Sequence, residues 1–408
     1  MKNTPPRGMN DMLPEDMALR DAVQGRIIAT YRQYGYHRIS TPILEDADNL
    51  NKSDGGDNLN LIYQVMKRGE KLETALQKNE PLWDLGLRYD LTLPLTRFYA
   101  ANRAKLPNPC KIIQTDRVYR AERPQKGRLR EFVQCDIDII GDATLRAEAE
   151  LIAVTAQALQ NVGFTGFTVR VNDRRILNAL LLALGFGADS LPTVLVSFDK
   201  LDKVGVEGVC AELGEKAQPE SAISGLRDFL QEVDPLAALA AVAGELEEAA
   251  ALKRLIAETN QVGGGDWDVA FDLSLVRGQG YYTGCVFEIV SGEFEGAIAG
   301  GGRYDNMIEK FIGIPTPAVG FSIGFERIIS ILKERGTRPP DQKPRLALLY
   351  EESRPFPEVY AEVQALCGDY LVTALPLDGD NPGKQRKRLA KEGFDSLCKL
   401  GEGPQALS

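Results

Sequence analysis

The sequence predicts an α+β protein, in which an antiparallel sheet is flanked by helices and followed by a small α/β domain. Three observations predict this class. Short strand-like segments separated by turn signals occupy residues 86–140 and return after residue 265. Between them, residues 176–259 are rich in Leu and Ala and predict a helical block. Residues 346–400 then alternate strand-like and helix-like segments.

Length and composition are those of a folded globular chain without a membrane segment. At about 150 residues per domain, 408 residues predict two or three domains. Hydrophobic residues make up 44% and charged residues 26% of the chain. The longest apolar stretches, residues 179–184 and 236–243, are too short to span a bilayer. Residues 1–10 lack the apolar core of a secretory signal, so we expect a cytoplasmic protein.

Cysteine and histidine usage argues against several common sites. The six cysteines are spread along the chain with no C-x-x-C pair, so we expect reduced thiols. His37 is the single histidine, which excludes an H-E-x-x-H zinc site and leaves a Ser-His-Asp hydrolase dependent on one residue. We favour a structural or surface role for His37. No G-x-G-x-x-G follows a predicted strand, so dinucleotide binding has no support.

The first part of the chain predicts a helix followed by short strands. Pro14 and the acids after it start a helix whose apolar spacing continues to about Tyr34. Residues 38–44 have strand character, and Pro42 places this strand at an edge or an interface because proline has no N–H for a central ladder. Four further strands and then a helix are predicted, in order, at residues 86–90, 110–114, 117–121, 131–140 and 148–161.

The second part predicts a pocket-forming sheet. A strand at residues 167–171 precedes the helical block, and an alternating strand follows it at residues 267–276. Fourteen of the 39 glycines fall between residues 263 and 324, where backbones must approach closely or take positive φ. We therefore expect an antiparallel sheet whose floor is a pocket. Residues 320–333 close this part as a strand and a helix.

The last part begins after residues 333–343, a charged stretch with two prolines that predicts a linker. A β-α-β-α-β pattern follows, at residues 346–350, 357–367, 370–375, 383–392 and 396–400.

Basic residues are concentrated in two places on a chain whose net charge is −10. Residues 103–130 hold nine basic and two acidic residues, a local charge of +7, and residues 384–391 hold five more basic residues. This pattern suggests a phosphate-bearing partner, although a solvated charged face would also explain it.

One predicted hairpin combines side chains that seldom share a face. Its first strand ends near Arg120, and on its second strand the period of two places four side chains together: Phe132, Gln134, Asp136 and Asp138. Buried charge costs several kcal/mol, in the range of about 3 to 5, unless it is paired. A solvent-facing hairpin would explain the carboxylates but not the aromatic ring among them. We therefore interpret this face as functional.

This hairpin resembles motif 2 of class II aminoacyl-tRNA synthetases, with Arg120-Ala-Glu122 as its R-x-E, and its return strand is similar to the histidyl-tRNA synthetase version. Five other segments occur in that family's order: its opening at residues 6–14, motif 1 at 38–45, an amino-acid-binding strand at 87–92, the histidine signature at 275–284 and motif 3 at 318–327. The resemblance covers nearly the whole chain. It implies the class II antiparallel sheet in a catalytic core of two parts, 1–172 and 265–335, with a helix-rich insertion at 173–264 and an anticodon-binding-like α/β domain at 344–408.

The resemblance implies a histidine–tRNA ligase, which activates L-histidine with ATP and Mg²⁺ and transfers it to tRNA(His), forming AMP and diphosphate. Negative charge spreads over phosphate oxygens in this reaction, so positioned cations should dominate catalysis. Arg120 would hold the α-phosphate, Arg327 the γ-phosphate, and Arg277 would bridge the substrate carboxylate and the α-phosphate. Phe132 would stack on adenine with Glu122 near its amino group. No metal ligand and no tightly bound organic cofactor is assigned.

The implied amino-acid site must bind an ammonium group and a neutral imidazole. The residues implied for it are Asp90, Thr92 and Gln134 for the ammonium, Asp138 and Tyr282 for the ring nitrogens, Tyr281 beside them and Arg277 for the carboxylate. Such a site rejects apolar isosteres, because its own polar groups would be left unpaired.

The resemblance also implies macromolecular partners. The basic loop would meet the tRNA acceptor end through Arg123, Gln125, Lys126 and Arg128. The second helix of the C-terminal domain would face phosphate, and a homodimer would form through the motif 1 region. The sequence ends at Ser408, before the last strand and helix expected of a complete anticodon-binding domain, so we expect this domain to be truncated.

Two other interpretations stay open. The synthetase-like regulatory subunit of ATP phosphoribosyltransferase resembles the same core but usually lacks the anticodon domain and the catalytic arginine pattern. Here Arg120, Arg277 and Arg327 are present, so we favour the enzyme. A synthetase-derived binding protein without activity is the third alternative. One departure from the family lies in the histidine signature, where Gln279-Gly280 replaces the usual Leu-Asp.

Overall fold

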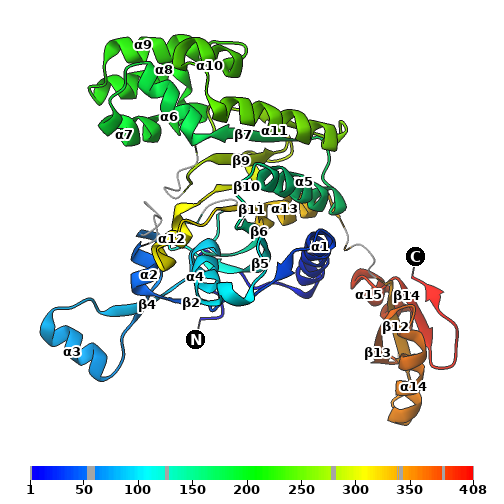
Figure 1. Cartoon of the computed structure of the whole chain (residues 1–408). Coiled ribbons are helices and arrows are strands. Elements are labelled where there is room, and N and C mark those ends of the chain that lie inside the picture. Colours follow the sequence, from blue (N-terminus) through cyan, green and yellow to red (C-terminus); the bar gives the residue numbers. More distant parts are fainter. Residues whose placement is uncertain are drawn as a thin grey trace. The chain divides into compact units, whose positions relative to one another are not determined.

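The computed structural model describes residues 2–52, 60–124, 128–276, 282–337, 339, 343–378 and 382–407. The chain divides into two compact units, Met1–Thr337 and Arg338–Ser408 (Figure 1). Each unit has its own sheet and its own apolar core.

An eight-stranded sheet forms the centre of the first unit, as predicted for the fold class. Its six central strands are antiparallel, and the pairs β1–β5 and β7–β8 at the two edges are parallel. In spatial order the strands are β1 (His37–Arg38), β5 (Cys110–Tyr119), β6 (Glu131–Ile140), β11 (Ala318–Gly324), β10 (Ala297–Arg303), β9 (Cys285–Val290), β7 (Phe167–Asp173) and β8 (Trp267–Phe271).

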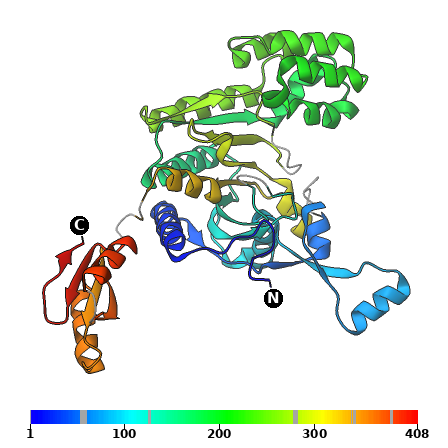
Figure 2. The same cartoon turned by 180° about the vertical axis from the view of Figure 1, so that it is seen from behind.

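Helices α1 (Pro14–Gln33), α5 (Arg146–Asn161) and α13 (Phe325–Glu334) pack together against one face of this sheet (Figures 1 and 2). Pro14 stands in the first turn of α1, where its missing N–H costs nothing. The apolar stripe of α1 is buried against β6 and α5, with Ile27, Ile137 and Leu151 all inaccessible to solvent. Helices α4 (Thr92–Asn102) and α12 (Asn306–Ile312) pack against each other within a second apolar cluster.

The predicted strand at residues 38–44 is interrupted, which corrects the sequence-based boundaries. Only β1 joins the large sheet, and Leu44 begins β2 (Leu44–Asp46) of a separate three-stranded sheet, β2-β4-β3. The buried Arg88 guanidinium donates to the carbonyl oxygens of Thr41 and Pro42 at 2.7 and 3.3 Å. A side chain therefore holds the segment that Pro42 keeps out of a ladder. The other elements here are β3 (Gln64–Met66), β4 (Trp83–Leu87), α2 (Ala47–Lys52) and α3 (Glu70–Lys78).

The helical block predicted between β7 and β8 is present. Asp173 and Asp234 accept hydrogen bonds from the first-turn amides of α6 and α10, as capping side chains do. Its helices are α6 (Arg174–Ala183), α7 (Leu191–Phe198), α8 (Leu201–Glu215), α9 (Glu220–Phe229), α10 (Pro235–Ala243) and α11 (Glu247–Gly263).

The second unit is an α/β fold, as predicted, with helices on both faces of its sheet. Leu346 and Leu348 of β12 share a cluster with Val359 of α14, while Ala347 and Leu349 share one with Leu389 of α15. The unpredicted β15 adds an antiparallel edge to parallel strands. The elements are β12 (Arg345–Tyr350), α14 (Phe356–Leu366), β13 (Leu371–Pro376), α15 (Pro382–Lys391), β14 (Ser396–Lys399) and β15 (Gln405–Ala406).

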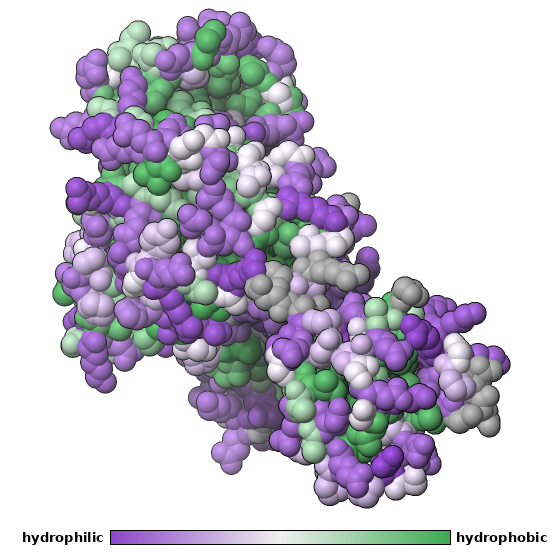
Figure 3. All heavy atoms as spheres, turned by 90° about the vertical axis from the view of Figure 1, so that its right-hand side faces the viewer, coloured by the Kyte–Doolittle hydropathy of each residue, from purple (hydrophilic) through white to green (hydrophobic). Residues whose placement is uncertain are grey.

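Hydrophilic side chains cover most of the face shown in Figure 3, with smaller apolar patches between them. Within the described residues, no helix combines the length and the apolar character that crossing a membrane requires. The six cysteines are free thiols, as predicted.

Candidate active site

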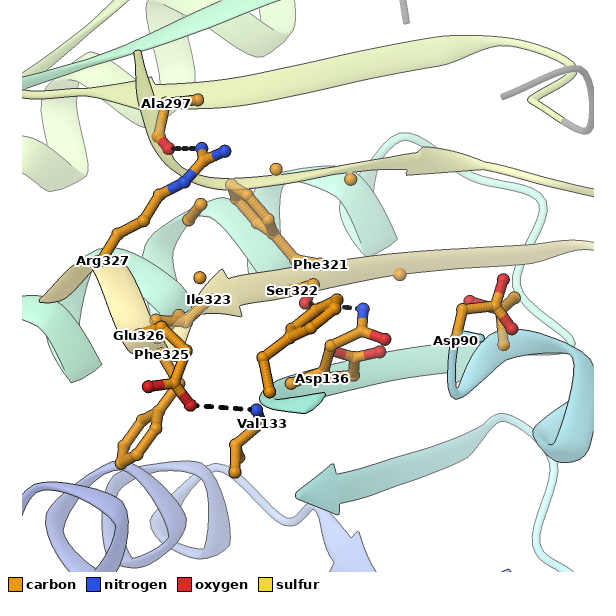
Figure 4. Close-up of a pocket in the computed structure, with 18 of the residues that line it drawn as sticks. Asp90, Val133, Asp136, Ala297, Phe321, Ser322, Ile323, Phe325, Glu326 and Arg327 are labelled. Atoms are coloured by element: carbon orange, nitrogen blue, oxygen red, sulfur yellow. Dashed lines mark hydrogen bonds between the residues drawn. The ribbon is translucent and has the colours of Figure 1, made fainter. Parts of the chain in front are cut away.

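A pocket of about 420 Å³ opens over β6, β11 and β10, on residues that the sequence analysis selected. Nine predicted site residues line it: Asp90, Thr92, Arg120, Glu122, Arg128, Phe132, Gln134, Asp138 and Tyr282. Arg327 lines it as well, from the start of α13 (Figure 4). The volume is in the range typical of small-ligand sites.

The floor of the pocket depends on glycines that lie opposite larger side chains. Gly320 of β11 is the cross-strand neighbour of Asp138 on β6, and a Cβ on Gly320 would fall on the Asp138 Oδ1 atom. Gly302 of β10 leaves space for Tyr282 in the same way, since a Cβ added at Gly302 would lie 2.8 Å from the Tyr282 ring. The crowded glycines of the sequence therefore make room for polar side chains of the site.

Asp138 lines the pocket and is 4% exposed. The Tyr304 hydroxyl donates to its Oδ1 atom at 2.7 Å. Burial raises the pKa of Asp138 to about 7, with a smaller contribution from Asp90, while the Tyr304 hydrogen bond opposes the shift. Tyr304 was not among the predicted site residues, and no local sequence pattern distinguished it.

Asp90 approaches from the segment between β4 and α4. Its Oδ1 atom accepts the Leu93 amide at 3.2 Å, so the carboxylate sits at the positive end of α4. Burial nevertheless raises the pKa of Asp90 to about 6, and Arg120 partly offsets this effect. Thr92 is in the first turn of the same helix and also lines the pocket.

Gln134 and Asp136 extend the polar face of β6 and line the pocket, where Figure 4 labels Asp136. The Gln134 amide donates to the Ser322 hydroxyl at 3.4 Å. Burial and then the charge of Asp138 raise the pKa of Asp136 well above its ordinary value. Asp136 was predicted to share this face but had no predicted role, although the period of two was the signal that could have found it.

Two arginines contribute positive charge to the other part of the pocket. The Arg120 Nε atom donates to the Tyr89 carbonyl at 3.0 Å, and its guanidinium lies 5.1 Å from the centre of the Phe132 ring. Arg327 donates to the Ala297 carbonyl and lies 5.6 Å from the centre of the Phe294 ring. Glu122 and Arg128, which also line the pocket, form an ion pair in which Arg128 Nη1 lies 3.6 Å from Glu122 Oε2.

Glu326, which precedes Arg327, joins three segments of the first unit. Arg20 of α1 donates to both of its carboxylate oxygens at 2.7 Å. The Val133 amide of β6 donates to Glu326 Oε1 at 3.1 Å (Figure 4). The Arg20 guanidinium also lies 4.9 Å from the centre of the Phe325 ring. These contacts connect α1 to the strand and helix that carry Phe132 and Arg327, a connection that the sequence analysis missed.

Four predicted site residues fall outside the part of the chain that the structure describes: Gln125, Lys126, Arg277 and Tyr281. Gln279 and Gly280 of the signature fall there too. Arg123 is exposed beside the basic loop. Among the described residues, no group of three or more His, Cys, Asp or Glu side chains is arranged to hold a metal ion. The roles of all these residues stay predictions.

The chain is similar to proteins of one family along most of its length. The family model described as histidyl-tRNA synthetase matches residues 8–328. The histidine–tRNA ligase of Leifsonia xyli subsp. xyli is 44% identical, over 97% of this chain and 94% of the relative. The histidine–tRNA ligase of Aeropyrum pernix is 35% identical, over 97% of this chain and 90% of the relative.

Solved structures give the same fold. The histidyl-tRNA synthetase of Nostoc sp. PCC 7120 aligns with a TM-score of 0.80 at 26% identity, over 97% of this chain and 91% of that chain. A Bacillus halodurans C structure titled as an ATP phosphoribosyltransferase regulatory subunit/histidyl-tRNA synthetase aligns with a TM-score of 0.79 over 98% of both chains. Its identity is 22%, so this similarity supports the fold alone.

Proposed function

Because this chain belongs to the histidyl-tRNA synthetase family, we propose that it is a histidine–tRNA ligase. In the first step, the carboxylate of L-histidine attacks the α-phosphorus of ATP, and the bond to the β-phosphate oxygen breaks to release diphosphate. In the second step, a terminal ribose hydroxyl of tRNA(His) takes the histidyl group and AMP leaves. The observation that carries this proposal is the single pocket in which two arginines and a stacking ring adjoin a group of buried polar side chains.

The arginine part of the pocket suits the triphosphate. Arg120 and Arg327 come from segments more than 200 residues apart, yet both line one cavity. Fixed guanidinium groups stabilise charge that develops on phosphate oxygens without reorganising during the reaction. Phe132 offers a flat apolar surface for adenine, and Glu122 can accept from its amino group. Mg²⁺ would arrive with ATP, and we assign it no protein ligand.

The carboxylate part suits histidine. The Tyr304 hydrogen bond occupies one oxygen of Asp138, which leaves the other available to an imidazole N–H. Tyr282 lines the same region and can meet the second ring nitrogen. Asp90, Thr92 and Gln134 receive the ammonium group in this proposal. Arg277 bridges the carboxylate and the α-phosphate, with Tyr281 beside the ring.

The remaining parts of the chain take the roles that the family implies. Residues 1–172 and 265–335 form the catalytic core, 173–264 the insertion and 344–408 the anticodon-binding-like domain. The loop residues Arg123, Gln125, Lys126 and Arg128 meet the acceptor end of the tRNA. We also propose a homodimer through the motif 1 region and a cytoplasmic location.

Histidine-dependent exchange of labelled pyrophosphate into ATP tests the proposal directly. We expect exchange with the unmodified protein, and a loss on the order of 100- to 1000-fold for Arg277→Ala, because one positioned cation is removed from the reacting phosphate. Arg254→Ala, on the exposed side of α11, is the matched control and should leave exchange unchanged.

Absent exchange in a folded protein that binds histidine would contradict the ligase and favour the regulatory-subunit alternative. Exchange that survives Arg277→Ala would remove Arg277 from the catalytic role and leave the ligase standing. Aminoacylation of tRNA(His) transcripts then tests the second step.

A further inference from the structure

Three buried oxygen atoms in the pocket accept no hydrogen bond from any residue that the structure describes. They are Asp90 Oδ2, Gln134 Oε1 and Asp136 Oδ1. Buried acceptors are normally satisfied, because leaving one unpaired costs free energy. Three of them on residues that line one cavity indicate a missing donor group rather than three separate defects.

The surroundings of Asp136 explain why its oxygen is left over. Its cross-strand neighbours are Gln114 on β5 and Ser322 on β11. The Gln114 amide is already engaged, because it donates to the Leu91 carbonyl at 2.9 Å and accepts from Thr41 at 3.3 Å. Ser322 accepts from Gln134, and its single hydroxyl proton serves at most one oxygen of Asp136, whose Oδ1 atom stays without a partner. The strand partners thus leave part of the carboxylate open toward the pocket.

The charge of Asp136 is only partly compensated by its surroundings. Burial and then the charge of Asp138 raise its pKa most, with a smaller contribution from Asp90, while a hydrogen bond with Ser322 and the charge of Arg120 offset part of the shift. Asp136 is 6% exposed, and Asp90 is 3% exposed. Two carboxylates so deeply buried create a site for a positive charge.

We propose that Asp136 joins Asp90 and Gln134 in one ammonium subsite and supplies the third acceptor for the α-ammonium group of the bound substrate. This assignment rests on the proposed function, which makes histidine the substrate. An ammonium group has three N–H donors, one for each of the three unpaired oxygens. Asp136 is then a binding residue of the site and takes the third acceptor position that the sequence resemblance gave to Thr92, which lines the pocket beside it.

An ammonium group fits these atoms better than the other donors of the substrate or than water. A neutral imidazole has one N–H and water has two, so neither satisfies three acceptors. Asp138, two residues along the same face, already holds a hydrogen bond from Tyr304 and is the carboxylate proposed for the ring. The two aspartates of one strand therefore take two different parts of the ligand.

Three ligands distinguish the contribution of the ammonium group from that of the ring. Their affinities are measured by isothermal titration calorimetry at about pH 8, where the imidazole is neutral. L-Histidine has the amine, the carboxylate and the ring; histamine lacks the carboxylate; 3-(imidazol-4-yl)propionate lacks the amine. We expect Asp136→Asn to lower the affinity for L-histidine and for histamine by about 10- to 100-fold, because a charged acceptor is lost. Its affinity for the propionate should be unchanged. Asp138→Asn is the matched control, and it should weaken all three ligands.

Thermal unfolding of the free protein gives a second test. Removing an uncompensated buried carboxylate should raise the Tm of Asp136→Asn and Asp136→Ala, whereas a purely structural role would lower it. The gain should grow as pH rises from about 4, because the unfolded wild-type chain then ionises Asp136 while the folded protein resists its ionisation, which destabilises the folded state.

Equal weakening of all three ligands by Asp136→Asn, or a lowered Tm in both variants, would overturn the assignment and leave the ligase intact. Wild-type protein that binds neither L-histidine nor histamine would overturn the proposed function and this assignment with it.

Discussion

Two groups of buried charges in the first unit differ in how they are balanced. At the end of β10, the Arg303 guanidinium donates to both oxygens of Glu148 at 2.6 and 2.7 Å, and the two side chains are 9% and 1% exposed. In the pocket, Asp90 and Asp136 are buried to a similar degree, yet each keeps an oxygen without a partner among the described residues.

The pKa shifts follow this difference. Burial lowers the pKa of Arg303, but its bond to Glu148 outweighs that effect and raises it above the ordinary value. Burial raises the pKa of Asp90, Asp136 and Asp138, which means that the folded protein resists their ionisation. A buried pair makes the fold depend on both partners, because removing one leaves the other charge buried and unpaired, whereas a buried carboxylate without a partner favours binding of a positively charged ligand.

The largest effect should come from breaking the balanced pair. Glu148→Ala leaves the Arg303 guanidinium buried without its carboxylate, so we expect a loss of about 3–5 kcal/mol in the free energy of unfolding. Urea denaturation of the free protein measures it.

Glu150→Ala, on the same helix, is the matched control. Glu150 pairs with Lys111 at 2.7 Å, but these side chains are 32% and 28% exposed. A partly solvated pair contributes little, so the loss should stay below about 1 kcal/mol. Similar losses in both variants would contradict the importance of burial in this comparison.

An intermediate effect should come from Arg20→Met, which removes the guanidinium by which α1 binds Glu326 beside the pocket. Loss of these two charged hydrogen bonds should lower the free energy of unfolding by about 1.5–3 kcal/mol. Because Glu326 also holds the Val133 amide, we expect KM for ATP to rise more than KM for histidine in pyrophosphate exchange. The control is Arg32→Met, an exposed position near the end of α1, and equal changes in the two KM values would refute the positioning role.

Per pH unit and per titrating group, the smallest effect should be the pH dependence of histidine binding. Asp90 and Asp138 have pKa values of about 6 and about 7, and each must be ionised to accept the ligand strongly. As pH falls below about 7 they take up protons, so the affinity for L-histidine should drop by about tenfold per pH unit for each group that titrates, or about 1.4 kcal/mol. Stability of the free protein should change in the opposite sense and decrease as pH rises from about 4 toward 7.

Isothermal titration calorimetry between about pH 5 and 8 measures this dependence. The imidazole of the ligand itself titrates at about pH 6.5, so Asp138→Asn is used to distinguish the titration of Asp138 from that of the ligand. Equal losses of affinity in the wild-type protein and in Asp138→Asn as pH falls would assign the dependence to groups other than Asp138 and contradict its titration in this window.

Local patterns of the sequence predicted much of the fold. Strand β6 has the predicted bounds, and α1 and the β-α-β-α-β unit lie within a residue or two of theirs. The hydrophobic periods of two residues in strands and 3.6 residues in helices depend only on residues close together along the chain, so one sequence is enough to detect them. The split of residues 38–44 was not predicted, because Arg88 acts on it from outside the local pattern.

Local patterns alone were sufficient to predict the order of the motifs, the strand face with Phe132, Gln134 and Asp138, and the crowded glycines. The folded arrangement was needed to show which oxygens of that face lack a donor among the described residues. It also revealed that Tyr304 donates to Asp138, that Ser322 accepts from Gln134 and that Arg20 pairs with Glu326. Hydrogen bonding and burial are properties of groups brought together from distant positions, such as Arg20 and Glu326, 306 residues apart. No periodicity along the chain records such an encounter, because it is the packing of the sheet and helices that brings these groups within reach of each other.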